Sequence, residues 1–340
     1  MKKHGFLNGL VRRNEFYILL TIILLGFIIQ FRSGQFFTIN NIVDIIVSMI
    51  VPAMLAMCAF LVIISGGIDV SFPAIASLSM YITTDMLLSS GFTGSIIWAF
   101  VISAAFGLVF GAVNGILASW LNLPTLIITL GTSSVYIGIM QGVLNAREIA
   151  EIPGPMHEFG NAALFVAKNP ESGLTSNLSP AVLILLGIVV VSFLFLRYTM
   201  LGRGIYALGG DEIAAKRAGF NVKTTKFLVY TFSGFIAGIA GITRVCMLQN
   251  CYPTNLLGAE MTAIAAVVLG GASIVGGIGT ITGVLLGTGL ITLMSNSMIL
   301  LGIPTYWQSF FTGMLILIGV GVSAYRTVLS KKKLHSKNED

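Results

Sequence analysis

The sequence contains few charged residues. Charged side chains make up 9% of its 340 residues and apolar ones 56%, whereas soluble domains carry roughly a quarter charged residues. A soluble protein of this length needs more polar surface, because the buried fraction rises only slowly with size. The low charge therefore excludes the soluble classes and indicates a protein whose solvent is the lipid bilayer.

Histidine and cysteine are also scarce, with three of each. Cys58, Cys246 and Cys251 are odd in number and lack metal-binding spacing, and the histidines are scattered over different segments. We therefore expect no disulfide, no metal site and no catalytic residues. An integral-membrane enzyme would need clustered histidines or carboxylates, so this hypothesis is disfavoured.

The sequence also lacks the phosphate-binding pattern G-x-x-x-x-G-K-[ST]. That loop cradles nucleotide phosphates with its backbone amides and a lysine. We therefore expect this chain to bind no nucleotide and no other cofactor.

Long apolar segments fill most of the chain. A spanning helix needs about 20 predominantly apolar residues. We count ten candidate segments, at roughly 15–31, 41–64, 72–90, 95–118, 123–144, 180–197, 226–247, 260–272, 276–300 and 305–325. The sequence therefore predicts an all-α polytopic membrane protein with about ten transmembrane helices.

Basic residues are distributed unevenly between the two sides that these segments define. With the N-terminus inside, all but four of the 19 lysines and arginines lie on the inner side, the exceptions being Arg32, Arg147, Lys168 and Arg244. Lysine and arginine collect on cytoplasmic loops, so this pattern predicts both termini inside. The net charge of +6 is then an orientation signal, and we expect no nucleic-acid partner.

We expect one transmembrane domain over residues 1–325 and a basic cytoplasmic tail over 326–340. The domain includes an outer loop, 145–179, and an inner loop, 198–225. Within the outer loop, the apolar patch 162–167 is expected to lie on the membrane surface.

Small residues recur four apart in several spans, a pattern that predicts close packing of helices in lipid. They are Gly107, Gly111 and Gly115, then Gly234 and Gly238, then Gly279, Gly283 and Gly287. The glycine pairs at 66–67 and 270–271 are expected to break helices near the inner side. The two apolar runs that contain these pairs, 62–71 and 268–275, weakly indicate an internal repeat.

Charged residues in or beside the spans are Asp44, Asp69, Asp85, Arg244 and Glu260. Each costs roughly 2.5 to 3.5 kcal/mol at a helix centre, so we expect them near helix ends or facing one another. All except Asp69 are expected in an outer-face polar cluster. There they would cap helices or pair with one another, line a vestibule, or contact an external partner.

Asp69 belongs to a different predicted motif, which also contains Gly66, Gly67 and Ser71. We expect this structural motif at the inner face. There Asp69 and Ser71 would cap the next helix, ahead of Pro73 in its first turn.

The inner loop contains the signals of a short helix. Asp211 suits the N-cap, Glu212 the first turn, Lys216 and Arg217 the last turn, and Gly219 the stop. A helix of about eight residues is roughly 12 Å long. It is long enough to transmit force from a cytosolic partner, although an ordinary loop helix carries the same caps.

Four stretches stand out along the chain: 65–71 (SGGIDVS), 123–132 (LPTLIITLGT), the inner loop from 201 to 222, and 260–277 (EMTAIAAVVLGGASIVGG). Together they resemble the ribose-type permease subunits of sugar ABC importers. The stretches lie in the family's order and cover most of residues 40–325. The chain is therefore expected to be a non-catalytic permease subunit of the bacterial cytoplasmic membrane.

The resemblance implies that the inner loop is a coupling helix that docks on an ATPase subunit. The match to the family's loop rests on Glu212, Ala214, Ala215 and Gly219. The expected coupling residues are Gly210, Asp211, Glu212, Ala214, Ala215, Lys216, Arg217 and Gly219.

The resemblance also implies partners. They are two ATPase subunits that carry ATP and Mg, a second copy or a sister permease, an extracytoplasmic sugar-binding protein, and membrane lipid. Ribose, another pentose, a hexose or a furanose-like signal such as autoinducer-2 all fit as substrate.

A neutral sugar needs hydrogen-bonding side chains with little fixed charge along its route. The candidates are Asn114, Thr129, Thr132, Ser133, Ser295, Asn296 and Gln308, because polar groups at lipid depth face the interior. Hydrogen bonding between helices is their alternative role. The alternative function is an ion-coupled secondary transporter of a small polar solute, which requires carboxylates at mid-membrane.

Overall fold

The computed structural model describes residues 14–121, 123–169 and 173–307, together with 310–311, 313–314, 317 and 321. Within that part of the chain, seven helices are long and apolar enough to cross a membrane. These seven are α2 (Asn14–Ser33), α3 (Ile39–Ile64), α5 (Ile97–Trp120), α6 (Thr125–Gly138) as continued to Val143, α8 (Ala181–Tyr198), α11 (Val222–Leu248) and α13 (Ile281–Leu300). Helix α4 (Phe72–Ser89) is a further long helix of the bundle. The shorter elements are η1 (Ile139–Val143), α7 (Gly154–Asn161), β1 (Phe165–Lys168), β2 (Thr175–Leu178), α9 (Met200–Gly210), α10 (Glu212–Arg217), α12 (Ala259–Leu269) and η2 (Thr305–Trp307).

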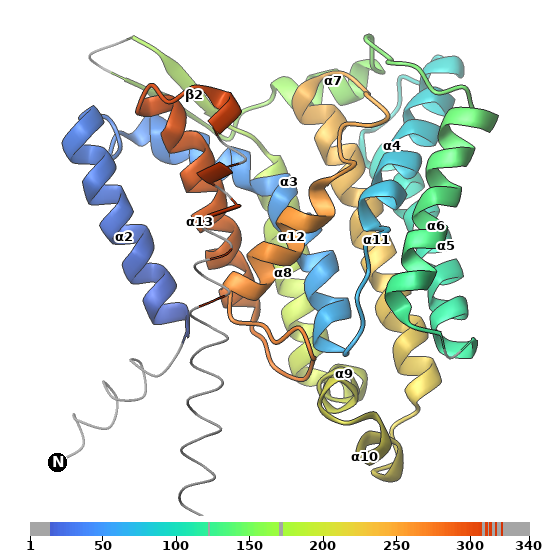
Figure 1. Cartoon of the computed structure of the whole chain (residues 1–340). Helices are drawn as coiled ribbons and strands as arrows, with labels where there is room; N and C mark the ends of the chain where they lie inside the picture. Colours follow the sequence, from blue (N-terminus) through green and yellow to red (C-terminus); the bar gives the residue numbers. More distant parts are fainter. Residues whose placement is uncertain are drawn as a thin grey trace, which may run out of the picture.

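The helices confirm the all-α polytopic architecture. Nine of the ten predicted segments coincide with a described helix. The tenth, 305–325, lies largely outside the described residues, so the count of ten stays a prediction. Helices α9 and α10 lie at one end of the bundle, which we call the inner end, and α7 and the β1–β2 hairpin lie at the opposite, outer end (Figure 1).

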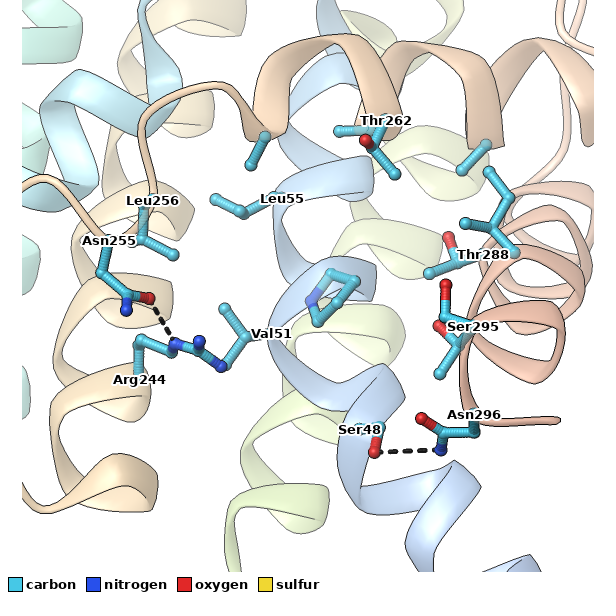
Figure 2. A pocket seen from close by; sticks show the side chains of 16 residues that line it. Ser48, Val51, Leu55, Arg244, Asn255, Leu256, Thr262, Thr288, Ser295 and Asn296 are labelled. Carbon is cyan, nitrogen blue, oxygen red and sulfur yellow. Dashed lines mark hydrogen bonds between the residues drawn. The ribbon is translucent and has the colours of Figure 1, made fainter. Parts of the chain in front are cut away.

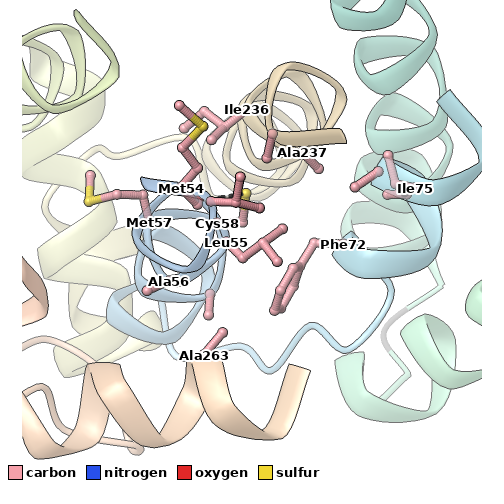
Figure 3. Packing of buried hydrophobic residues seen from close by; sticks show 14 of the residues in the cluster. Met54, Leu55, Ala56, Met57, Cys58, Phe72, Ile75, Ile236, Ala237 and Ala263 are labelled. Atoms are coloured by element: carbon pink, nitrogen blue, oxygen red, sulfur yellow. Dashed lines mark hydrogen bonds between the residues drawn. The ribbon is translucent and has the colours of Figure 1, made fainter. Parts of the chain in front are cut away.

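Helix α3 is the centre of the bundle. From Ile50 to Ile64 only Pro52 is not buried. Figure 3 shows its Met54 and Leu55 surrounded by side chains from α4, α11 and α12. A charged side chain is costly where neighbouring helices exclude water, and the only charge on α3 is Asp44, before the buried stretch begins.

Glycines set the contact between α5 and α11. Gly107 and Gly111 of α5 face Gly234 and Gly238 of α11, and a Cβ at Gly111 would lie 2.6 Å from the Tyr230 carbonyl oxygen. The predicted close packing of these helices is confirmed. In α13, Gly283 meets Gly270 and Gly287 meets Ala266 in the same way.

After α3 the backbone is no longer helical. Gly66 has a φ of +83°, a conformation that glycine adopts without strain. Residues 67–71 then run back into the bundle as non-helical chain, so α4 begins at depth instead of at the inner end (Figure 1). A second break follows α12, where Gly271 has a φ of +90°. Both predicted breaks are confirmed, but the segments that follow them differ, and the internal repeat stays a prediction.

The outer loop contains the only β-strands in the described part of the chain. Strands β1 and β2 pair antiparallel, with Phe165 opposite Leu178. Asn40 of α3 donates from Nδ2 to the Ala167 carbonyl over 2.9 Å, and Ala167 is buried. Part of the apolar patch 162–167 therefore forms a strand packed on α3. Phe165 and Val166 remain exposed.

Candidate functional site

Helix α10 forms where the sequence predicts a helix in the inner loop, although it is shorter than expected, with six residues. Asp211 Oδ1 accepts from the amides of Ile213 (2.8 Å) and Ala214 (3.0 Å). Gly219, with a φ of +91°, reverses the chain after the helix. The predicted N-cap and stop are confirmed.

One face of α10 is attached to the bundle and the other is free. Lys226 at the start of α11 donates to both carboxylate oxygens of Glu212, over 2.9 and 3.0 Å, the one ion pair found among the described residues. The side chain of Ala215 lies on the attached face of α10 and is buried, whereas that of Ile213 is 66% exposed. Lys216 and Arg217 are exposed as well. The helix therefore presents an apolar side chain and two cations at the inner end.

Helix α9 was not expected. Its N-cap is Thr199, whose Oγ1 accepts from the Gly202 amide over 2.9 Å, and the helix lies across the inner end (Figure 1). The sequence contains the capping threonine, but it also places four glycines within the helix. Because glycine is unfavourable in helix interiors, the sequence did not predict a helix here. The inner loop therefore holds two helices in succession.

The end of α9 contacts two other segments through glycine. A Cβ at Gly209 would fall on Ile64 O and on Gly277 N, and one at Gly276 would lie 2.7 Å from both Gly209 O and Gly66 Cα. We call Gly66, Gly209, Gly276 and Gly277 the glycine junction. It joins the end of α3, the end of α9 and the loop before α13.

Tyr206 strengthens the same contact. Its hydroxyl donates to the Gly279 carbonyl over 3.1 Å. Burial raises the pKa of Tyr206 above its ordinary value, since the phenolate is poorly solvated there. The hydroxyl therefore remains a donor at neutral and mildly alkaline pH.

Asp69 and Ser71 lie deeper than the inner-face motif predicts, on the chain that runs back into the bundle. Asp69 Oδ1 accepts from Ser71 N (2.7 Å) and from Ser71 Oγ (2.6 Å). Asn114 Nδ2 of α5 donates to Ser71 Oγ over 2.6 Å. Asp69 is 2% exposed, so a carboxyl group is buried within the bundle, while Gly66 remains at the inner end.

Three predicted pathway residues bind the protein's own backbone and side chains in this region. Besides Asn114, Thr129 Oγ1 accepts from the Val70 amide over 3.3 Å, and Thr132 Oγ1 donates to Thr129 O over 3.3 Å. Their observed contacts match the alternative role of internal hydrogen bonding. Ser133 is half-buried on α6, and Gln308 lies outside the described residues.

The remaining two pathway candidates, Ser295 and Asn296, lie on a cavity of about 330 Å³ between α3, α11, α12 and α13. We call it the outer cavity. Its polar lining consists of Ser48, Arg244, Asn255, Thr262, Thr288, Thr292, Ser295 and Asn296. The spacing of Thr288, Thr292 and Ser295 places them on one helix face, a signal that was available in the sequence.

The outer cavity has two polar walls and an apolar floor (Figure 2). On one wall Arg244 Nε donates to Asn255 Oδ1 over 2.8 Å. On the other, Asn296 Nδ2 donates to Ser48 Oγ over 3.1 Å. Val51 and Leu55 of α3 lie between them.

The four residues of the predicted outer-face polar cluster form no common cluster of ion pairs among the described residues. Arg244 lines the outer cavity, and Glu260 Oε2 accepts from the Gly258 amide over 3.0 Å at the start of α12. Asp44 belongs to α3 and Asp85 to α4. No ion pair connects these four residues in the part of the chain that the structure describes.

Comparison with known proteins places this architecture in a family. Residues 41–320 match the family described as the permease component of branched-chain amino acid transport systems. The ribose import permease protein RbsC of Escherichia coli strain K12 is 34% identical over 304 residues, covering 89% of this chain and 91% of that protein.

Import permeases for another compound are similar to this chain as well. The autoinducer 2 import system permease protein LsrC of Yersinia pseudotuberculosis serotype O:1b is 31% identical over 304 residues, covering 89% of this chain and 82% of that protein. LsrC of Photorhabdus laumondii is 30% identical over 309 residues, covering 91% and 89%. No solved structure matches the chain. The chain therefore belongs to this family of permease components, whose match covers residues 41–320.

Proposed function

We propose that this chain is the permease subunit of an ATP-driven ABC importer and forms the membrane pathway for a small sugar. The similarity to ribose and autoinducer 2 import permeases over nine tenths of the chain supports the sugar class. The family description names branched-chain amino acids, but it covers the permease component in general, and the identified relatives import other compounds.

The observation that carries the coupling part of the proposal is the geometry of α10. Its Glu212–Lys226 pair fixes the helix on α11, and its exposed Ile213 projects from the inner end. The cores of protein–protein interfaces combine apolar side chains with arginine, and α10 presents Ile213 and Arg217, four residues apart on one helix face, without bundle contacts that bury them. We assign that contact to an ATPase subunit, which supplies ATP and Mg, whereas this chain supplies the route.

A basic groove beside α10 extends the same surface. Lys216, Lys223 and Lys226 line it together with Glu212. It fits an acidic partner surface, and the lysines would accelerate docking more than they would tighten it. A binding protein at the outer end and a second permease, either another copy or a sister chain, complete the proposed importer.

Asp69 favours a second candidate function. Its buried carboxyl group lies within the bundle, where an ion-coupled transporter requires one. Both hydrogen bonds to Asp69, however, come from Ser71 and end on the same oxygen, Oδ1. We therefore assign Asp69 to holding the non-helical run in place.

The test is co-purification of the ATPase subunit with the full-length chain. We expect Ile213→Glu to reduce co-purification at least tenfold, because a carboxylate replaces the apolar contact. Leu164→Glu, a similarly apolar and exposed position at the outer end, serves as the matched control. Equal recovery of the ATPase with both variants would contradict the assignment of α10.

A further inference from the structure

The outer cavity lies where the helical path of the chain is interrupted. Between α11 and α12 the chain descends from the outer end without helical structure (Figure 1), and Asn255 and Leu256 of this segment line the cavity. Helix α12 has only 11 residues and is roughly 16 Å long, about half the thickness of the hydrocarbon core. Non-helical backbone at this depth is stable only against protein or a water-filled cavity.

The cavity contains one charged side chain. Arg244 is half-buried four residues before the end of α11, and its Nε donates to Asn255. No ion pair of Arg244 is found in the described part of the chain. A guanidinium at this depth costs free energy unless its donors are used, and its remaining N–H groups belong to the wall of the cavity.

The other polar groups of the lining are neutral hydroxyls and amides, and no carboxylate is among the lining residues. Thr262, Thr288 and Ser295 present hydroxyl groups opposite the Arg244–Asn255 wall (Figure 2). Neutral hydroxyls and amides on one wall, and the N–H groups of Arg244 and Asn255 on the other, match the hydroxyl groups of a sugar ring, and Val51 and Leu55 match its C–H face. The volume is near the lower end of the range of small-molecule sites, roughly 300 to 1,000 Å³.

We propose that the outer cavity is a substrate-binding site within a single permease chain and takes a neutral polyhydroxylated molecule of monosaccharide size. This inference rests on the proposed function and adds a site and a selectivity to it. A zwitterionic amino acid is expected to bind less well there, because Arg244 can pair with its carboxylate but no lining carboxylate pairs with its ammonium group. Burying that cation unpaired is costly.

Thiol labelling of the purified full-length chain in lipid nanodiscs tests the site. Cys58, Cys246 and Cys251 are all buried, at 0% exposure, so Ser295→Cys introduces a thiol at the cavity over a low background. We expect D-ribose at millimolar concentration to slow its modification by a small methanethiosulfonate reagent at least threefold. L-leucine at the same concentration is expected to leave the rate unchanged.

Two variants in the Ser295→Cys background identify the lining. Thr288→Val keeps the shape of the side chain and removes its hydroxyl, and Arg244→Met removes the guanidinium. We expect each to reduce protection by D-ribose at least threefold. Thr243→Val is the matched control, since Thr243 and Thr288 are both buried and both donate to the carbonyl four residues earlier, but Thr243 does not line the cavity. Should Arg244→Met fail to fold, Thr288→Val decides.

The outcome separates this inference from the proposed function. If D-ribose gives no protection while the assembled importer still takes up D-ribose with ATP, the cavity assignment is overturned and the function stands. Stronger protection by L-leucine than by D-ribose would overturn the selectivity. Protection by D-ribose without ATP-driven uptake supports the site and contradicts the importer.

Discussion

The backbone amide of Gly277 donates to the carbonyl oxygen of Ile64 over 3.0 Å. This hydrogen bond joins the loop before α13 to the last residue of α3. Gly209 of α9 lies against the same two residues. The inner loop, the central helix and α13 therefore meet at one point, where a movement of α9 would reach both membrane helices.

Gly209→Ala tests the glycine junction. Its new Cβ would collide with Ile64 O and Gly277 N, and overpacking of this kind costs roughly 1 to 3 kcal/mol. We expect a lower midpoint of thermal unfolding in detergent and a loss of ATP-driven uptake. Gly210→Ala is the control for stability, because a Cβ there meets nothing within 4 Å. Equal midpoints for the two variants would contradict the close contact.

The α5–α11 interface makes a second prediction. Gly111→Ala places a Cβ 2.8 Å from Gly234 Cα, so the helices must separate. We expect the midpoint of thermal unfolding to fall by an amount that corresponds to about 1 to 3 kcal/mol. Gly131→Ala of α6 has open space around it and should leave the midpoint unchanged; a decrease as large as that of Gly111→Ala would argue against glycine packing as the cause.

The features predicted from the sequence are those set by local patterns. Apolar length located the spans, and the i, i+4 glycines of α5 and α11 identified the packing surface, because close approach requires small residues at that spacing. Asp211 and Gly219 bounded α10 through capping rules that act within a few residues.

The features that were missed depend on distant contacts. The run from Gly67 to Ser71 enters the bundle because Thr125 and Thr129 of α6 satisfy its amides, and no local pattern shows that α6 will lie there. For Arg244 the sequence allowed the lining of an outer vestibule, but the cavity wall that it forms with Asn255 depends on the descent of the chain after α11. Helix α9 was hidden by its four glycines, of which the glycine junction requires Gly209.

The Glu212–Lys226 pair should matter for coupling more than for stability. Glu212 is 53% exposed, and exposed ion pairs contribute less than about 1 kcal/mol. We expect Glu212→Gln to change the unfolding midpoint little and to reduce substrate-stimulated ATPase activity of the assembled complex severalfold. The exchange Glu212→Lys with Lys226→Glu should recover much of the activity, because it restores the pair that holds α10. Failure of the exchange would mean that the pair does not act by positioning the helix.

Asp69 should act as an acceptor for Ser71. Asp69→Ala leaves the buried amide and hydroxyl of Ser71 without that acceptor, at a cost of roughly 1 to 3 kcal/mol. Asp69→Asn keeps an oxygen at the same position and is expected to be milder by thermal unfolding. If Asp69→Asn were as harmful to stability as Asp69→Ala, the negative charge would be essential and the hydrogen-bonding account of Asp69 would fail.

The most direct test of the central claim is uptake of radiolabelled D-ribose into proteoliposomes under two energy sources. One set contains the chain with its ATPase subunits and binding protein and receives ATP on the ATPase side. The other contains the chain alone and a proton or sodium gradient. We predict uptake in the first set and none above background in the second. Uptake driven by the gradient alone would contradict the importer and make Asp69 the first residue to examine as an ion carrier.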